Sequence, residues 1–266
     1  MKIAIIGAGN LGLSIAKGVL HSNGATTMFL TKRNIESIKD FEKYGNVTVS
    51  SDNEKAVKQS DVLIFAVQPG HFAKILEDVK HLLTEKHVVI STITGFSIAR
   101  MESILGKDKF IIRSMPNTAI SVGKSMTCIC TNEAGKKRID LAKAIFNRMG
   151  HSMEIPEDQM QAATVICASG IAFWMRLIRA TTQGAIQLGF DSKEAQELAV
   201  HTCDGAAELL IASGNHPEEE IDKVTTPMGC TIQGLNEMEH QGLSSSLIRG
   251  IVASFEKISE FKTNNQ

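Results

Sequence analysis

The 266-residue sequence predicts an α/β fold, with a doubly wound, mainly parallel sheet followed by an all-helical domain. Three observations predict it. Short apolar runs alternate with helix-like segments as far as residue 155, glycines follow directly on the first apolar run, and beyond Pro156 only helical patterns continue. We therefore place one domain at residues 1–155 and a second, helical domain at residues 156–266.

The first domain contains eight runs that we expect to form strands. The first of them includes four consecutive apolar residues, Ile3 to Ile6, bounded by glycine, which is typical of a strand buried on both faces. The predicted strands are Lys2–Ile6, Thr27–Leu30, Val47–Val49, Val62–Val67, Val88–Ser91, Phe110–Ser114, Met126–Cys130 and Ser152–Ile155. Because helical patterns separate most of these runs, helices are expected on both faces of a mainly parallel sheet.

The second domain reads as helical from Asp158 to Phe261, with interruptions at glycine and proline. Its first helix is apolar on several faces, and such a helix must be enclosed. The residues concerned are Val165, Ile166, Ile171, Phe173, Met175, Leu177 and Ile178. Since about 110 residues complete such burial poorly, we expect a second copy of the chain to pack there, giving a homodimer or a higher homo-oligomer built from dimers.

The overall composition favours a small-molecule partner. The formal net charge is -1 and 43% of residues are hydrophobic, so no global field recruits nucleic acid or an anionic membrane. Met1 and Lys2 lead straight into a strand, which leaves no signal peptide and predicts a cytoplasmic protein. Arg176 and Arg179 interrupt the apolar segment from Ala162 to Leu188, so we expect no membrane span.

Cysteine and histidine usage predicts no metal site. The five cysteines include no C-x-x-C pair, and the eight histidines are dispersed. Cys128 and Cys130 lie two apart in a predicted strand, where we expect buried, reduced thiols.

The segment Gly7-Ala8-Gly9-Asn10-Leu11-Gly12 is a G-x-G-x-x-G between the first strand and a helix. The first glycine permits a tight turn, the second lets a pyrophosphate approach the backbone, and the third lets helix and strand pack closely. The free N–H groups of the helix then face the phosphates. This context predicts a Rossmann-like, dinucleotide-binding domain, with an ordinary glycine-rich turn as the alternative.

The end of the second strand predicts NADP(H) in preference to NAD(H). An NAD site would place a carboxylate about 20 residues after the glycines, but the chain has Thr31, Lys32, Arg33 and Asn34 there. A guanidinium can pair with a 2′-phosphate and stack on adenine. The alternative is a pair of solvated charges at a helix start.

Further strand ends are candidates to flank the cofactor, because ligands of doubly wound sheets lie beyond the carboxyl ends of strands. They are Ala66-Val67-Gln68-Pro69-Gly70, Thr92-Ile93-Thr94-Gly95 and the end of the strand at Met115 to Asn117. A later loop, Val224 to Gly229, enters a helix at Cys230, and the unpaired N–H groups of that helix suit a substrate carboxylate. An ordinary turn or helix start is the alternative at each of these places.

Five segments together resemble the pyrroline-5-carboxylate reductase family, which makes proline by NADPH-dependent reduction of a cyclic imine. In chain order they are GAGNLG, FAVQPG, IIRSMPNT, ASGIAFWM and VTTPMGCTIQGLNEME, and they span nearly the whole chain. The last two discriminate, since many dehydrogenases share the first. The resemblance implies NADP(H) as cofactor, a helical dimerisation domain, and an active site near the last loop.

The resemblance also implies roles for individual residues. The backbone N–H groups of Gly229, Cys230 and Thr231 would hold the substrate carboxylate, and the Thr231 hydroxyl would act at the ring nitrogen. Asn117 would border both substrate and nicotinamide. The implied cofactor-binding residues are Gly7, Gly9, Asn10, Leu11, Gly12, Thr31, Lys32, Arg33, Ala66, Val67, Gln68, Pro69, Met115 and Asn117. A protonated imine is already electrophilic, so hydride delivery needs mainly proximity and orientation.

Several positions depart from the family pattern. Gln68 replaces a lysine, Ala119 and Ile171 replace prolines, and Met228 and Cys230 replace smaller residues in the last loop. Two other functions therefore stay open. One is reduction of another cyclic imino acid or a small keto acid, and the other is a non-catalytic NADP-binding sensor or scaffold. A 3-hydroxyacid-dehydrogenase type would be expected to use a lysine between Ala162 and Phe173, and that segment contains none.

Overall fold

The computed structural model describes residues 1–263, and the burial of side chains as far as residue 258. The chain divides into two compact units, which are taken separately below. One contains residues 1–169 and the C-terminal segment from residue 257, and the other contains residues 170–256.

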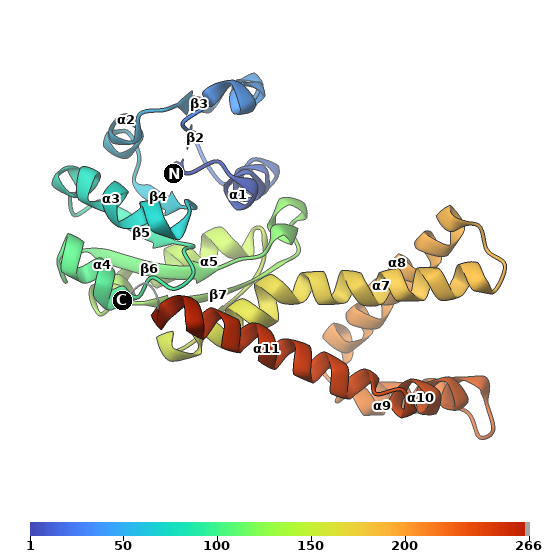
Figure 1. Ribbon diagram of the computed structural model, residues 1–266. Coiled ribbons are helices and arrows are strands. Elements are labelled where there is room, and N and C mark those ends of the chain that lie inside the picture. Colours follow the sequence, from blue (N-terminus) through green and yellow to red (C-terminus); the bar gives the residue numbers. More distant parts are fainter. Residues whose placement is uncertain (264–266) are drawn as a thin grey trace. The chain divides into compact units, whose positions relative to one another are not determined.

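An eight-stranded sheet forms the centre of the first unit (Figure 1). Its strands are β1 Lys2–Ile6, β2 Thr27–Thr31, β3 Val47–Ser50, β4 Val62–Phe65, β5 Val88–Ser91, β6 Phe110–Met115, β7 Ser125–Thr131 and β8 Gly150–Glu154. Their order is β3-β2-β1-β4-β5-β6-β7-β8, and every neighbouring pair is parallel except β6 and β7. The predicted doubly wound, mainly parallel sheet is confirmed.

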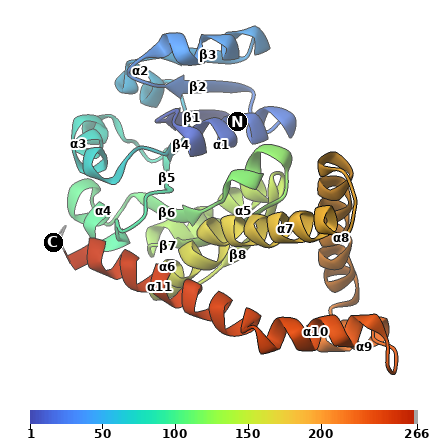
Figure 2. The ribbon, with the colours of Figure 1, turned by 45° about the vertical axis from the view of Figure 1, so that its right-hand side comes forward.

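Helices cover both faces of this sheet (Figure 2) and bury two separate apolar clusters. One face carries α1 Asn10–His21, η1 Ile35–Tyr44, η3 Thr118–Val122 and α5 Ile139–Asn147. The other carries α2 Asn53–Lys58, α3 Pro69–Val79, α4 Ile98–Leu105 and α6 Met160–Ala163. Ile15 and Val19 of α1 and Phe72 and Leu76 of α3 are fully or almost fully buried, as their helical spacing requires. The short elements η2 Lys80–Leu82, η4 Ala134–Arg138, η5 Glu157–Gln159 and the π-helical η6 Thr164–Ser169 complete the unit.

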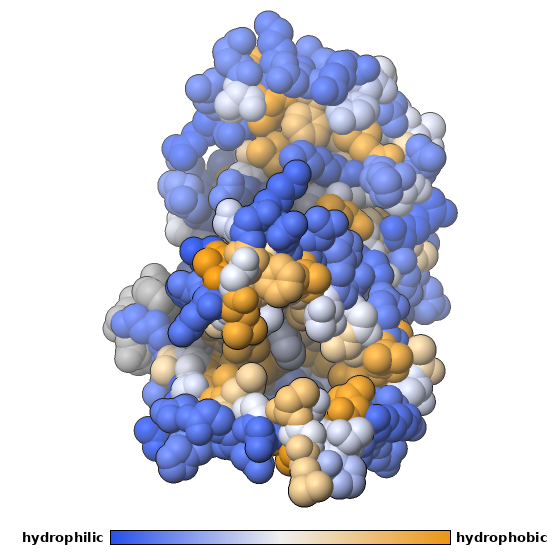
Figure 3. Space-filling view, turned by 90° about the vertical axis from the view of Figure 1, so that its right-hand side faces the viewer, coloured by the Kyte–Doolittle hydropathy of each residue, from blue (hydrophilic) through white to orange (hydrophobic). Residues whose placement is uncertain are grey.

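The second unit is helical, as predicted. It contains α7 Gly170–Gln187, α8 Ser192–Ser213, α9 Pro217–Val224, α10 Cys230–His240 and most of α11 Leu243–Thr263, and α7 packs on α8. Many of its large apolar side chains are exposed, and Figure 3 shows hydrophobic groups on the surface that it draws. They include Trp174, Met175, Ile186, Leu188, Phe190, Leu198, Leu209, Ile211, Ile248, Val252 and Phe255. A single chain therefore leaves uncovered the apolar surface for which we expected a second copy.

One helical stretch within the described residues, Glu157–Gln187, is long and apolar enough to cross a membrane by length and composition. Arg176 and Arg179 thus do not by themselves exclude this segment on composition. Only 17% of its most apolar window is buried within the chain. Most of this apolar stretch is therefore not covered by the rest of the chain.

Candidate cofactor cleft and substrate loop

A cleft of about 470 Å³ lies in the first unit, at the carboxyl ends of β1, β2 and β4. The chain leaves β1 toward β2 on one side and later returns to β4 on the other, and ligands bind at such a switch point. Eight predicted cofactor-binding residues line it: Gly7, Gly9, Thr31, Lys32, Arg33, Ala66, Val67 and Gln68. The other six, Asn10, Leu11, Gly12, Pro69, Met115 and Asn117, are not among its lining residues.

The glycine turn at the base of the cleft fits a dinucleotide. Gly7 has φ +102°, and its N–H and that of Ala8 both donate to the Thr31 carbonyl oxygen, at 3.2 and 2.8 Å. A Cβ on Gly12 would overlap the Gly7 carbonyl oxygen, whereas a Cβ on Gly9 would meet open space. The first and third glycines are therefore required by the chain's own geometry, and the second leaves the cleft side of the turn clear for a phosphate.

Helix α1 begins at this turn with Gly9 as its N-cap, and no described side chain caps it. Its first N–H groups, which include those of Asn10, Leu11 and Gly12, therefore remain as donors at the positive end of the helix dipole. This arrangement suits the pyrophosphate of a dinucleotide. Asn10, Leu11 and Gly12 would contribute through their backbones.

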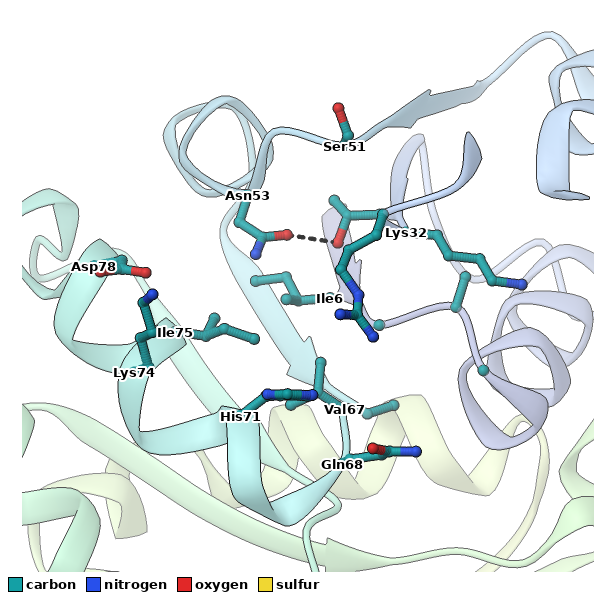
Figure 4. Close-up of a pocket in the computed structure, with 16 residues that line it drawn as sticks. Ile6, Lys32, Ser51, Asn53, Val67, Gln68, His71, Lys74, Ile75 and Asp78 are labelled. Atoms are coloured by element: carbon teal, nitrogen blue, oxygen red, sulfur yellow. Dashed lines mark hydrogen bonds between the residues drawn. The ribbon is translucent and has the colours of Figure 1, made fainter. Parts of the chain in front are cut away.

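One wall of the cleft is positively charged, with Lys32 and Arg33 directly after β2. On the other side, α3 contributes Lys74 and Asp78, the single carboxylate among the lining residues (Figure 4). The exposed Arg33 follows directly on β2, where the sequence predicts the 2′-phosphate. A group with two negative charges fits this wall better than the unphosphorylated ribose of NAD does.

Thr31 reaches the cleft differently from the prediction. Its side chain is buried, and its hydroxyl donates to Asn53 Oδ1 at 2.7 Å (Figure 4). Among the described residues, no hydrogen-bond partner is found for Asn53 Nδ2, which leaves that amide group as a donor. Thr31 thus positions Asn53, and Asn53 is the residue of the pair that can offer a donor to a ligand.

Sequence reasoning missed a second group of cleft residues: Ser51, Asn53, His71, Lys74, Ile75 and Asp78. Figure 4 shows His71 and Lys74 on α3 and Asn53 on α2. His71 and Lys74 lie one helical turn apart, directly after the strand-end segment Ala66–Pro69, and this i, i+3 spacing is the signal that could have found them.

The end of β6 lies apart from the cleft lining, and its polar groups are engaged within the protein. Asn117 Oδ1 accepts from the Ala119 N–H at 2.9 Å, and its Nδ2 donates to the Cys167 carbonyl oxygen at 3.0 Å. Met115 is buried. Arg113 pairs with Glu157 at 2.6 Å. The border with nicotinamide therefore stays a prediction for Met115 and Asn117, and Arg113 serves the fold.

The predicted substrate loop lies in the second unit. Gly229 is the N-cap of α10, and no described side chain caps that helix, so the N–H groups of Cys230, Thr231 and Ile232 remain as donors. The Gly229 N–H donates to the Thr226 carbonyl oxygen at 2.9 Å, and a Cβ on Gly229 would overlap Thr226 Oγ1. Thr231 is half-buried and Cys230 is exposed. The loop therefore has the backbone needed to bind a carboxylate.

The same loop shows strain. Met228 has φ +58°, in the left-handed region that favours glycine, and its side chain is 96% exposed. Met228, which replaces a smaller residue of the family pattern, therefore has a backbone conformation that glycine would adopt more easily.

Comparison with known proteins agrees with this geometry. Residues 2–95 match the family model described as NADP oxidoreductase coenzyme F420-dependent, and residues 157–261 match that of pyrroline-5-carboxylate reductase dimerisation. Pyrroline-5-carboxylate reductase 2 of Dictyostelium discoideum is 40% identical over 276 residues, which cover 97% of the chain and 92% of that protein. Reductase 1 of the same organism is 42% identical over 99% of the chain, but the chain spans only 50% of its length.

Solved structures lead to the same group. The structure of a pyrroline-5-carboxylate reductase from Coxiella burnetii has a TM-score of 0.88 and 29% identity, with 97% of each chain covered. That of Plasmodium falciparum pyrroline carboxylate reductase, with NADP bound, has a TM-score of 0.86 and 25% identity, with 98% of each chain covered.

The Rossmann-like sheet, the glycine cradle and the cationic wall define the class of NADP-dependent oxidoreductases. The matching modules on both halves of the chain, and relatives of 40% identity along nearly its full length, narrow that class. The chain belongs to the pyrroline-5-carboxylate reductase family.

Proposed function

We propose that the chain reduces the C=N bond of 1-pyrroline-5-carboxylate to give proline, with NADPH as hydride donor. The observation that carries this proposal is the similarity to pyrroline-5-carboxylate reductases along 97% of the chain, which includes both the cofactor-binding half and the dimerisation half. The glycine cradle and the Lys32–Arg33 wall support NADP(H) as the cofactor.

The cofactor supplies a hydride, and the residues of the chain bind and orient. The N–H groups at the start of α1 would hold the pyrophosphate, and Arg33 the 2′-phosphate, with Asn53 donating to the same part of the nucleotide. The N–H groups of Cys230, Thr231 and Ile232 would hold the substrate carboxylate. The Gly229 N–H, expected from the sequence to join them, already donates to the Thr226 carbonyl oxygen. The Thr231 hydroxyl can donate or accept, so it can orient the ring nitrogen. These assignments need no paired carboxylates.

The assembly proposal concerns the apolar surface of the second domain, whose boundary we place at residue 156. The dimerisation match covers residues 157–261, so it includes the stretch Glu157–Gln187 that is long enough to span a membrane. A second copy of the chain accounts for that surface without a bilayer. We propose a homo-oligomer built from dimers and working in the cytoplasm.

The test is oxidation of NADPH by the purified protein in the presence of 1-pyrroline-5-carboxylate. We expect rapid, saturable oxidation, with proline as product. Turnover only with other cyclic imines or keto acids would support the second function, and tight NADPH binding without turnover on any of them would support the sensor. Either outcome would refute the proposed reaction.

Thr231→Ala tests the assignment of the substrate loop. We expect turnover to fall far more than NADPH affinity does, because the hydroxyl orients the substrate and touches no part of the phosphate cradle. Thr48→Ala removes an exposed hydroxyl from β3 and should change neither quantity. Equal losses of turnover and affinity in Thr231→Ala would assign the loop to cofactor binding.

Arg33→Asp tests the assignment of the phosphate wall. We expect NADPH affinity to fall roughly 10- to 100-fold with little change for NADH, because only NADPH loses charge-assisted hydrogen bonds. Lys39→Asp is the matched control, since it makes the same charge change on η1, at a residue that does not line the cleft. If Arg33→Asp kept the same ratio of NADPH to NADH affinity, the 2′-phosphate would have to be recognised by other residues.

A further inference from the structure

Two thiols from distant parts of the first unit face each other. Cys128 Sγ and Cys167 Sγ are 3.8 Å apart, although the residues are 39 positions apart in the chain. Cys128 is on β7 and only 4% exposed, while Cys167 is on the π-helical η6 and half-buried. A disulfide requires an S–S distance of about 2.05 Å, so joining these thiols needs an approach of less than about 2 Å.

The pair is chemically asymmetric. The Cys128 thiol lies against Cys167 and is buried, and both the hydrogen bond and the burial raise the pKa of Cys128. The hydrogen bond from Cys128 lowers the pKa of Cys167 to about 7. Cys167 is therefore the thiolate that an oxidant would meet, with a neutral thiol in contact with it. A reactive cysteine with a resolving cysteine beside it is the usual arrangement of a redox-sensitive site.

Both thiols are linked directly to residues predicted to border the nicotinamide. In the register of β6 and β7, Cys128 lies opposite Met115. The Cys167 carbonyl oxygen accepts the hydrogen bond from Asn117 Nδ2 at 3.0 Å. Any shift of Cys167 toward β7 therefore acts on Asn117 through one hydrogen bond.

Cys167 lies on an irregular helical segment, whereas Cys128 lies inside the sheet. Residues Thr164–Ser169 form a π-helical segment between α6 and α7. Segments of this kind are rare, and they occur frequently at functional sites. On the strand side, Cys128 is held by ladders to both β6 and β8, so η6 is the side that moves.

We propose that Cys128 and Cys167 form an oxidisable dithiol that hydrogen peroxide converts to a disulfide and a thiol reductant restores. The Cys167 thiolate attacks one peroxide oxygen, the O–O bond breaks, and the departing hydroxide takes a proton to become water. The sulfur of Cys128, losing its proton, then attacks the sulfenic acid sulfur of Cys167. An S–S bond forms and a second water leaves. Two thiols lose two electrons in total, and one peroxide gains them.

The expected consequence rests on the proposed reductase activity. Closing the S–S bond draws η6 toward β7, moves the carbonyl oxygen that holds Asn117, and so displaces a predicted nicotinamide neighbour. Because small misplacements near the reacting atoms cost much of the rate, we expect oxidised protein to turn over roughly 10- to 100-fold more slowly. A thiol reductant should restore the rate.

The primary test is independent of activity. The full-length protein is treated with hydrogen peroxide, digested without reduction, and analysed by mass spectrometry. We expect a linked peptide pair containing Cys128 and Cys167, two hydrogens lighter than the free peptides and cleaved by dithiothreitol. Cys203→Ser should leave this pair intact, and Cys167→Ser should abolish it. In Cys128→Ser, which keeps a hydroxyl as donor beside Cys167 but cannot form the S–S bond, Cys167 should instead accumulate as a sulfenic acid that dimedone traps.

Two results would overturn the proposal. One is the absence of the linked pair while the exposed Cys230 is oxidised, and the other is a linked pair that leaves turnover unchanged in the fully oxidised protein. If the protein has no reductase activity, the linked pair still forms, so failure of the proposed function is distinguishable from failure of the dithiol.

Discussion

Met228 has a backbone conformation that lowers the stability of the chain. Its φ of +58° costs an L-residue about 1 kcal/mol or more relative to glycine, and its exposed side chain contributes little packing in return. Met228→Gly should therefore raise the free energy of unfolding by about 1 kcal/mol, measured by denaturant unfolding at a fixed protein concentration.

Met228→Ala is the matched control, because alanine keeps the Cβ and removes the rest of the side chain. It should leave the free energy of unfolding nearly unchanged. If alanine stabilised the protein as much as glycine, the methionine side chain and not the backbone would be the source of the cost.

Single residues were predictable where the backbone dictates them. The glycine turn could be assigned from spacing alone, because its constraints are partly local: Gly7 holds a φ of +102°, and a Cβ on Gly12 would overlap the Gly7 carbonyl oxygen. The close approach of Ala66 and Val67 to Gly7 was not predictable from spacing. Asn53 and Lys74 could not, since they reach the cleft only after α2 and α3 have packed on the sheet. The hydrogen bond from Thr31 to Asn53 joins positions 22 apart in the chain, so no local sequence pattern predicts it.

Between elements, one ion pair ties the last part of the first unit to its sheet. Arg113 on β6 is almost fully buried, and Glu157 on η5 is 34% exposed. Glu157 Oε1 accepts from Arg113 at 2.6 Å and from the Ile98 N–H, at the start of α4, at 2.7 Å. One carboxylate thus holds three elements together.

Glu157→Ala should lower the free energy of unfolding by about 2 kcal/mol, since it leaves the Arg113 charge buried without this partner. The loss is smaller than for a fully buried pair because Glu157 is partly solvated. Glu36→Ala breaks the exposed pair with Lys39 and should cost less than about 1 kcal/mol. Equal losses in the two variants, measured by denaturant unfolding, would contradict the role of burial.

The elements themselves were largely predictable. All eight predicted strands form, most of them at short apolar runs, and the differences are at strand ends. β4 stops at Phe65 and leaves Ala66 and Val67 to line the cleft, and β8, predicted at Ser152–Ile155, spans Gly150–Glu154. The direction of β7, antiparallel to β6, was not predictable, because an apolar run is the same read either way. The π-helical turn at Thr164–Ser169 was missed since it shares the composition of the helices around it.

For the whole first unit, one buried histidine makes stability depend on pH. His87 Nδ1 accepts from the Thr84 N–H at 2.9 Å, so Nε2 carries the proton and donates to the Val57 carbonyl oxygen at 3.1 Å. Burial is the main cause that lowers the pKa of His87 below its usual value of 6.5. Protonation would also remove the acceptor that Thr84 uses.

The sign follows from linkage. Below pH 6.5 the unfolded chain binds a proton that the folded chain resists, so this contribution to stability is complete above that value and declines as the pH falls. His87→Gln should flatten the pH dependence of the unfolding midpoint on the acid side of pH 6.5. His151→Gln, at an exposed position on β8, should leave the dependence intact. The same slope in both variants would assign the dependence to other groups.

The uncovered helical surface from Glu157 to Gln187 has a consequence for how the molecule is made. A newly folded chain keeps that surface in water until it meets another, so the amount of finished protein rises faster than in proportion to the chains synthesised. When the concentration of chains is low, each chain stays unassembled for longer and is more exposed to chaperones and proteases. The amount of assembled protein thus depends on the concentration of its own chains as well as on the stability of each chain.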